Sequence, residues 1–197
     1  MEITAVMVKE LRQKSGAGIM ECKQALKETE GDLEEAVTFL RKRGLAKADK
    51  KADRAASEGR IGSYIHAGGK IGVLVELNCE TDFVANTPDF QELVKDISMH
   101  IAAARPRFVS REQVTEDDLA REREIYAHQA RESGKPENII EKIVSGKMEK
   151  FYEEACLLDQ GFIKNSDITI HNLIKEHIAK LGENIVVGKF ARYEIEK

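Results

Sequence analysis

Apolar side chains recur at helical spacing through the first 45 residues. In the second of three short runs, Ile19, Cys22 and Leu26 follow one another at i, i+3 and i+7, which places them on one face of a helix. Gly31 interrupts this run, and a third apolar stripe stops near Gly44. The pattern predicts a miniature three-helix bundle. A bundle of that size buries little area and typically serves as a docking platform.

The segment at 41–54 is basic, with Lys and Arg interleaved with Ala. One interpretation is a solvated helical linker, because Ala and Lys favour helix. The other is a contact with nucleic acid or an acidic partner. The segment contains no aromatic residue for base stacking, which favours the linker.

From Gly59 the apolar period changes from 3.6 to 2 residues, as expected for β-strands. Alternating runs at 60–66 and 71–78 flank Gly68-Gly69, a strong hairpin signal. A third strand at 185–195 can complete a three-stranded antiparallel sheet. One apolar face is expected from Ile61, Ile65, Val73, Val75 and Leu77, and the opposite face from Leu74, Val186 and Phe190.

Helical periodicity returns after Thr87 and ends at Pro106. Two further helices at about 115–159 are separated by Gly134-Lys-Pro136, so we expect an antiparallel helical hairpin. Another helix is predicted at about 170–181.

Together these patterns predict an α+β fold with two domains. A helical head with its basic linker occupies 1–54, and a core and dimerisation domain occupies 55–197. In the core, helices cover one face of the small sheet. The second face then needs another protein. We expect a homodimer in which two such sheets stack as a sandwich.

Charge and cysteine usage narrow the class of protein. The chain has 31 Lys and Arg against 35 Asp and Glu, a net charge of −4 that disfavours non-specific binding to nucleic acid. The sequence contains neither an 18-residue apolar run nor a recognisable signal segment. Cys22, Cys79 and Cys156 are odd in number and far apart, which argues against a disulfide framework and a zinc site. These features indicate a soluble cytoplasmic protein.

The candidate chemistry lies where the second strand ends. The apolar pattern stops at Asn78, and Thr81-Asp82-Phe83-Val84 follows shortly after. Thr81 can cap a short helix, which would place an acidic and an aromatic side chain together on a protruding corner. The alternative is an ordinary strand-to-helix turn with Phe83 folded into the core. Residue types alone leave both interpretations open.

Motifs for an enzyme of its own are missing from the sequence. Gly16-Ala-Gly18 is not followed by the Lys-Ser/Thr of a phosphate-binding loop. His171 and His177 are six residues apart, which is not the one-turn spacing of zinc helices. Carboxylates beside Cys79 would disfavour its thiolate. A binding protein whose acidic-aromatic corner faces a partner is therefore the favoured class.

The chain resembles the elongation factor Ts family, in its short form, over nearly its whole length. The matching stretches are Val8-Lys-Glu-Leu-Arg12, Gly16-Ala-Gly-Ile-Met20 and Cys22-Lys-Gln-Ala-Leu26 of a ubiquitin-associated-like head; Gly72-Val-Leu-Val75 and the hallmark Thr81-Asp-Phe-Val84; and Met99-His-Ile-Ala102, Gly134-Lys-Pro136 and Phe190-Ala-Arg-Tyr-Glu194.

The resemblance implies a guanine-nucleotide exchange factor for the GTPase elongation factor Tu, in its GDP-bound and nucleotide-free forms. It implies no cofactor, no membrane and no direct nucleic-acid contact. In the short form, a homodimer makes up a missing second core subdomain. The implied partner-binding residues are Thr81, Asp82, Phe83 and Val84 beside the magnesium and phosphate site; Arg12, Ile19 (where many members have Met), Met20 and Lys23 in the head; and His100.

Two rival functions remain open at this point. A ribosome- or RNA-associated protein would use the basic segment at 41–54, and its RNA binding would depend steeply on salt. An enzyme built around Cys79 would show a reactive thiol.

Overall fold

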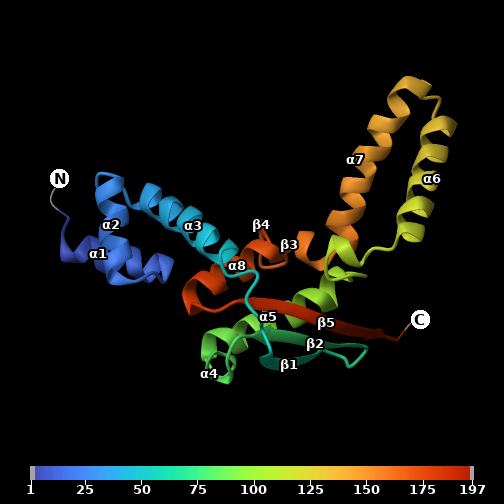
Figure 1. Ribbon diagram of the computed structural model, residues 1–197. Helices are drawn as coiled ribbons and strands as arrows, with labels where there is room; N and C mark the ends of the chain where they lie inside the picture. Colours follow the sequence, from blue (N-terminus) through green and yellow to red (C-terminus); the bar gives the residue numbers. More distant parts are fainter. Residues whose placement is uncertain (1–2, 196–197) are drawn as a thin grey trace. The chain divides into compact units, whose positions relative to one another are not determined.

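A computed structural model describes residues 3–195 of the chain, and the predicted α+β class is confirmed (Figure 1). A three-stranded antiparallel sheet has the order β1-β2-β5, and β3 and β4 form a second, two-stranded sheet. The elements are α1 Ala5–Ser15, α2 Ile19–Glu28, α3 Leu33–Asp49, β1 Glu58–Ile65, β2 Ile71–Cys79, α4 Asp82–Ala85, α5 Pro88–Ala104, α6 Glu116–Glu132, α7 Glu137–Ala155, β3 Gly161–Phe162, β4 Asn165–Thr169, α8 Ile170–Leu181 and β5 Ile185–Glu194, with short 3₁₀ turns at Arg111–Gln113 and Leu157–Asp159.

The chain divides into two compact units. Unit 1 holds the chain up to Gly59 together with Asn78–Leu93 and Asn172–Val186. Unit 2 holds Arg60–Leu77, Val94–His171 and the chain from Val187 onward. The predicted domains, 1–54 and 55–197, are the parts of the chain expected to fold independently. This division stays a prediction.

In unit 1, the predicted bundle of three helices is confirmed as α1–α3. Its core consists of small and aliphatic side chains, among them Leu11, Cys22 and Leu26, which are fully buried. Ile19 was expected on the same stripe as Cys22, but it is the first residue of α2 and is 57% exposed. The bundle therefore leaves an apolar side chain on its surface.

Helix α3 is longer than predicted. It continues through Gly44 to Asp49, and this half of the helix lies against α8. A Cβ placed at Gly44 would lie 3.2 Å from the Cβ of Ala179, so the glycine allows a close approach between the two helices. Ion pairs join the same helices: Arg41–Glu176 at 2.8 Å and Asp49–Lys175 at 2.6 Å.

Most basic residues of segment 41–54 have partners inside unit 1. In addition to the pair made by Arg41, Arg43 donates to Gln24 at 2.8 Å and Lys47 pairs with Glu21. Lys51 donates to the carbonyl of Gly182, and Arg54 lies 3.5 Å from Glu80. These contacts favour a structural role for the segment over an RNA-binding one.

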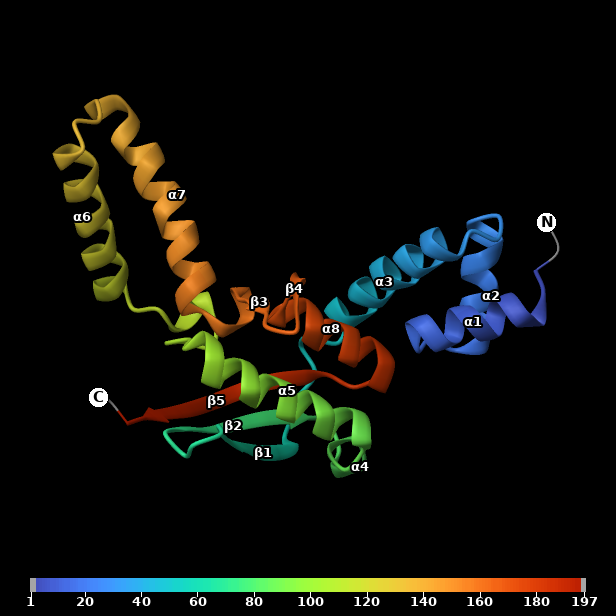
Figure 2. The same ribbon diagram turned by 180° about the vertical axis from the view of Figure 1, so that it is seen from behind.

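Helix α5 covers one face of the three-stranded sheet (Figures 1 and 2). Val73, Val75 and Leu77 of β2 are buried on this face, as predicted. The expectation that Ile61 and Ile65 share it is wrong, since they are 73% and 66% exposed.

The phase of β1 is set by Gly62. A Cβ at this position would lie 2.2 Å from Cγ1 of Val94 and 3.0 Å from Oγ of Ser98, both on α5. Gly62 therefore faces the helix, and alternation along the strand sends Ile61 to the opposite face. Leu74, 49% exposed, lies on that opposite face as predicted, and Val186 in β5 is also exposed, at 43%. Phe190 is half-buried.

We predict that Gly62→Ala lowers the free energy of unfolding by about 1–3 kcal/mol, the usual cost of overpacking a core. Gly146→Ala is the matched control. Gly146 lies in α7 with open space around its Cα, so the same change there should stabilise by up to about 1 kcal/mol. Urea unfolding of the two variants measures both values. Equal stability of Gly62→Ala and the unmutated chain would refute the close approach of β1 to α5.

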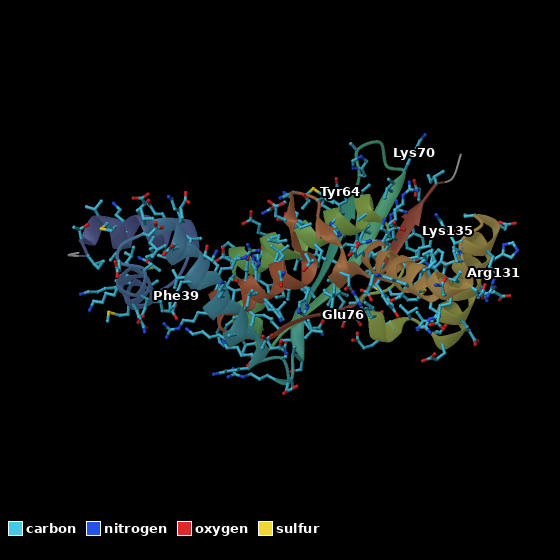
Figure 3. The ribbon with its side chains drawn as sticks, turned by 90° about the horizontal axis from the view of Figure 1, so that it is seen from above. Phe39, Tyr64, Lys70, Glu76, Arg131 and Lys135 are labelled. Carbon is cyan, nitrogen blue, oxygen red and sulfur yellow. The ribbon has the colours of Figure 1, made fainter. Side chains whose placement is uncertain are left out.

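Within unit 2, α6 and α7 form the expected helical hairpin, which projects away from the sheet (Figure 1). Arg131 and Lys135 lie at its tip (Figure 3). At its base, Arg111 pairs with Asp159 at 2.8 Å and with Glu149 at 3.0 Å, and its guanidinium lies 4.5 Å from the ring centre of Tyr152. The base of the hairpin is therefore held by ion pairs and by a cation–π contact.

Candidate functional site: an exposed acidic-aromatic corner

The corner begins where β2 ends at Cys79. Thr81 has extended backbone angles, and its Oγ1 accepts a hydrogen bond from the Val84 amide at 3.4 Å, which makes it the N-cap of α4. At the other end, the side-chain amide of Asn86 donates to the Asp82 carbonyl at 2.8 Å. Both ends of this four-residue helix thus have capping bonds.

Phe83 projects into solvent from α4. Its side chain is 82% exposed, so the interpretation that folds Phe83 into the core is wrong. Ala85 is the buried residue of this turn, Val84 is half-buried, and Asp82 is exposed. Leaving a phenylalanine in water forgoes about 2 kcal/mol of burial, so Phe83 contributes little to the packing of the free protein.

The corner is tied to the loop between α8 and β5. Glu183 accepts hydrogen bonds from the amides of Glu80 at 3.1 Å and Thr81 at 2.9 Å, and from the Thr81 hydroxyl at 2.6 Å. The role of Glu183 was not predicted from the sequence, because Glu183 and Thr81 are 102 residues apart. The residues around Glu183 indicated only a turn. No local pattern pairs such distant positions.

Asn184 extends the same network. Its backbone amide donates to the Glu80 carboxylate at 2.7 Å. Its side-chain amide donates to the carbonyls of Ala52 at 3.1 Å and Arg54 at 2.7 Å, in the segment that follows α3. The loop therefore links the corner to the chain that leaves the three-helix bundle.

Cys79 lies directly under the corner and is fully buried. Its thiol donates to the Thr81 carbonyl at 3.1 Å. Burial, and next the charge of Glu183, raise the pKa of Cys79 above its ordinary value. A thiol with a raised pKa is a poor nucleophile, so this setting disfavours an enzyme built around Cys79.

The predicted head residues lie on the surface of the bundle, around the turn between α1 and α2. Met20 is 74% exposed, and Arg12 and Lys23 are also exposed. With Ile19, they place two apolar and two basic side chains near the start of α2. This composition suits a partner surface that is partly apolar and partly acidic.

His100 is fully buried in unit 2. Its Nε2 lies 2.9 Å from Oε1 of Gln160, and its Nδ1 accepts from the Ile163 amide at 3.3 Å. Both ring nitrogens are therefore used to hold α5 against the β3–β4 strand pair, which the sequence did not predict. This arrangement favours a packing role for His100, and its predicted contact with a GTPase is untested.

Burial lowers the pKa of His100 below its ordinary value of 6.5, against the opposing effect of the Gln160 hydrogen bond. The unfolded chain then binds the proton first as pH falls below 6.5, so acid should destabilise the fold. We predict that the free energy of unfolding falls less between pH 7.5 and the lowered pKa in His100→Gln than in the unmutated chain. Urea unfolding across this range tests it. An unchanged pH dependence in the variant would contradict a neutral, buried His100.

The described residues contain no cluster of His, Cys, Asp or Glu suited to a metal ion. No helix among them is long and apolar enough to span a membrane.

The α+β fold with its exposed aromatic corner is compatible with a protein that binds a partner. A family model described as Elongation factor TS matches residues 4–197. Elongation factor Ts of Geobacter metallireducens is 61% identical over 195 residues, covering 99% of this chain and 90% of the relative. That of Geobacter sulfurreducens is 62% identical over 193 residues, covering 98% and 89%, and that of Heliobacterium modesticaldum is 57% identical over 193 residues, covering 98% and 90%.

The chain belongs to the elongation factor Ts family. Membership implies nucleotide exchange on elongation factor Tu, in protein synthesis. Proteins of this family act as exchange factors and do not catalyse a chemical reaction.

Proposed function

We propose that this chain releases GDP from elongation factor Tu by inserting Asp82 and Phe83 beside the magnesium and phosphate site. The observation that carries the proposal is the 82% exposure of Phe83 on a short helix with both ends capped. Phe83 would act as a wedge that moves the elements carrying the metal ligands. Asp82 would place negative charge near the oxygens and water ordered around magnesium.

The energetics require a second contact besides the wedge. GDP held at nanomolar affinity corresponds to about 12 kcal/mol of binding free energy, much of it from the magnesium and phosphates. The complex with the exchange factor must offset what the nucleotide loses. We propose that the bundle supplies this binding through Ile19 and Met20, with Arg12 and Lys23 beside them. Thr81 and Val84 complete the contact at the corner.

We also propose that the protein acts as a homodimer through the exposed face of its sheet. Ile61, Ile65 and Leu74 are all about half or more exposed on this face. The side chain of Ile65 lies over Gly72, with its Cδ1 3.1 Å from a Cβ placed there, so β1 and β2 present one continuous apolar surface. A second sheet stacked on this surface would remove it from water. We place the protein in the cytoplasm, with no membrane and no direct nucleic-acid contact.

Release of labelled GDP from elongation factor Tu tests the function. The release rate should rise with the concentration of this protein and approach a plateau, as a complex saturates. A rate that stays at the intrinsic value at all concentrations would reject the proposal. Salt-sensitive RNA binding without any effect on GDP release would favour the rival use of segment 41–54.

A further inference from the structure

The Glu183 carboxylate lies between the last residues of β2 and the loop that precedes β5, and it is half-buried. Both of its oxygens accept from the corner: Oε2 from the amides of Glu80 and Thr81, and Oε1 from the Thr81 hydroxyl. Hydrogen bonds to a charged acceptor are shorter and stronger than neutral ones. The three bonds together fix the direction in which the chain leaves the strand.

The Thr81 hydroxyl carries this constraint into α4. Its proton is donated to Glu183, which leaves the oxygen's lone pairs free to accept from the Val84 amide. The Thr81 oxygen therefore binds Glu183 as a donor and caps α4 as an acceptor. A helix of four residues has no stability of its own, so its position depends on this cap.

Glu183 is itself held firmly. Its neighbour Asn184 is 2% exposed and makes hydrogen bonds with Glu80, Ala52 and Arg54. The loop that carries Glu183 is therefore held both at the end of β2 and at the segment that follows α3. A side chain supported in this way can set the geometry of a functional group that it does not contact.

We infer that Glu183 is a positioning residue for exchange, acting through Thr81 to hold Asp82 and Phe83 in the projecting geometry. The inference rests on the proposed function. Glu183 does not touch the GTPase in this account. It removes the cost of ordering the corner when the partner binds, and that cost would otherwise slow the step in which Phe83 enters.

Glu183→Gln tests the inference in stopped-flow release of labelled GDP. A glutamine keeps the shape, but its amide nitrogen cannot accept from the corner. We expect the plateau rate to fall about tenfold or more, because small displacements of a working group are costly. The concentration for half-maximal rate should change less than about threefold, since the bundle still binds. Glu92→Gln, an exposed glutamate in the same unit, is the matched control and should retain the full rate.

A double-mutant cycle separates positioning from general destabilisation. In a Phe83→Ala background, Glu183→Gln should have little further effect on the rate, because the group that it positions is gone. Thr81→Val should reproduce the loss and Thr81→Ser should not, which gives a second route if Glu183→Gln folds poorly. Independent, additive effects of Glu183 and Phe83, or a full rate in Thr81→Val, would overturn the inference. Failure of the unmutated chain to speed GDP release would instead reject the proposed function.

Discussion

Phe83→Ala is expected to lower the plateau rate of GDP release by about 30- to 150-fold while leaving the fold unchanged. A phenylalanine buried at an interface contributes roughly 2–3 kcal/mol, and each 1.36 kcal/mol corresponds to about tenfold in rate. Its side chain is 82% exposed in the free protein, so truncation removes little from the core. The free energy of unfolding should change by less than about 0.5 kcal/mol. Asp82→Ala should have a smaller effect on the rate.

Stopped-flow release of labelled GDP and urea unfolding of the same preparations measure the two quantities. Ile125→Ala is a suitable control, because Ile125 is also exposed and apolar but lies on the hairpin helix α6. It should leave the rate unchanged. Loss of stability in Phe83→Ala comparable to its loss of rate would show that the side chain serves the protein's own packing.

Leu74→Asp is expected to convert the protein to a monomer with poor exchange activity. Leu74 lies at the centre of the sheet, in β2, and is 49% exposed on the uncovered face. In a dimer related by a two-fold axis, each such substitution buries two unpaired carboxylates, one from each copy. Val186→Asp in the neighbouring strand β5 should have the same effect.

Light scattering at micromolar concentration gives the oligomeric state, and GDP release gives the activity. Ile163→Asp introduces the same charge at a residue that is 43% exposed in the turn between β3 and β4, away from the sheet face. This control should remain dimeric and active. An unmutated chain that is monomeric and fully active under these conditions would refute the dimer.

Periodicity was sufficient to predict most elements of the fold. The hairpin at β1 and β2, the long helix α5 and the helix pair α6–α7 follow from local spacing and from Gly and Pro positions. The face of β1 was predicted wrongly, because alternation gives two equivalent phases. The choice between them depends on α5, whose Val94 and Ser98 leave room only for a glycine at position 62.

The geometry of the corner, like the face of β1, depends on contacts that local spacing does not reveal. The sequence located Thr81 as a cap and Phe83 beside it, but the exposure of Phe83 depends on which neighbours the fold supplies. Glu183 was missed because its three hydrogen bonds join segments about a hundred residues apart. The buried setting of His100 likewise depends on the β3–β4 pair, whose first strand is too short to show a period.

In the proposed mechanism, this protein and GDP weaken each other's binding to elongation factor Tu. Titration of the protein against nucleotide-free and GDP-bound elongation factor Tu measures this coupling. The ratio of the two dissociation constants should equal the factor by which saturating protein weakens GDP, because coupling between two sites is reciprocal. We predict clearly tighter binding to the nucleotide-free GTPase, and a smaller ratio for Phe83→Ala. Equal affinity for both forms would show that the protein does not compete with GDP, and would reject exchange by this route.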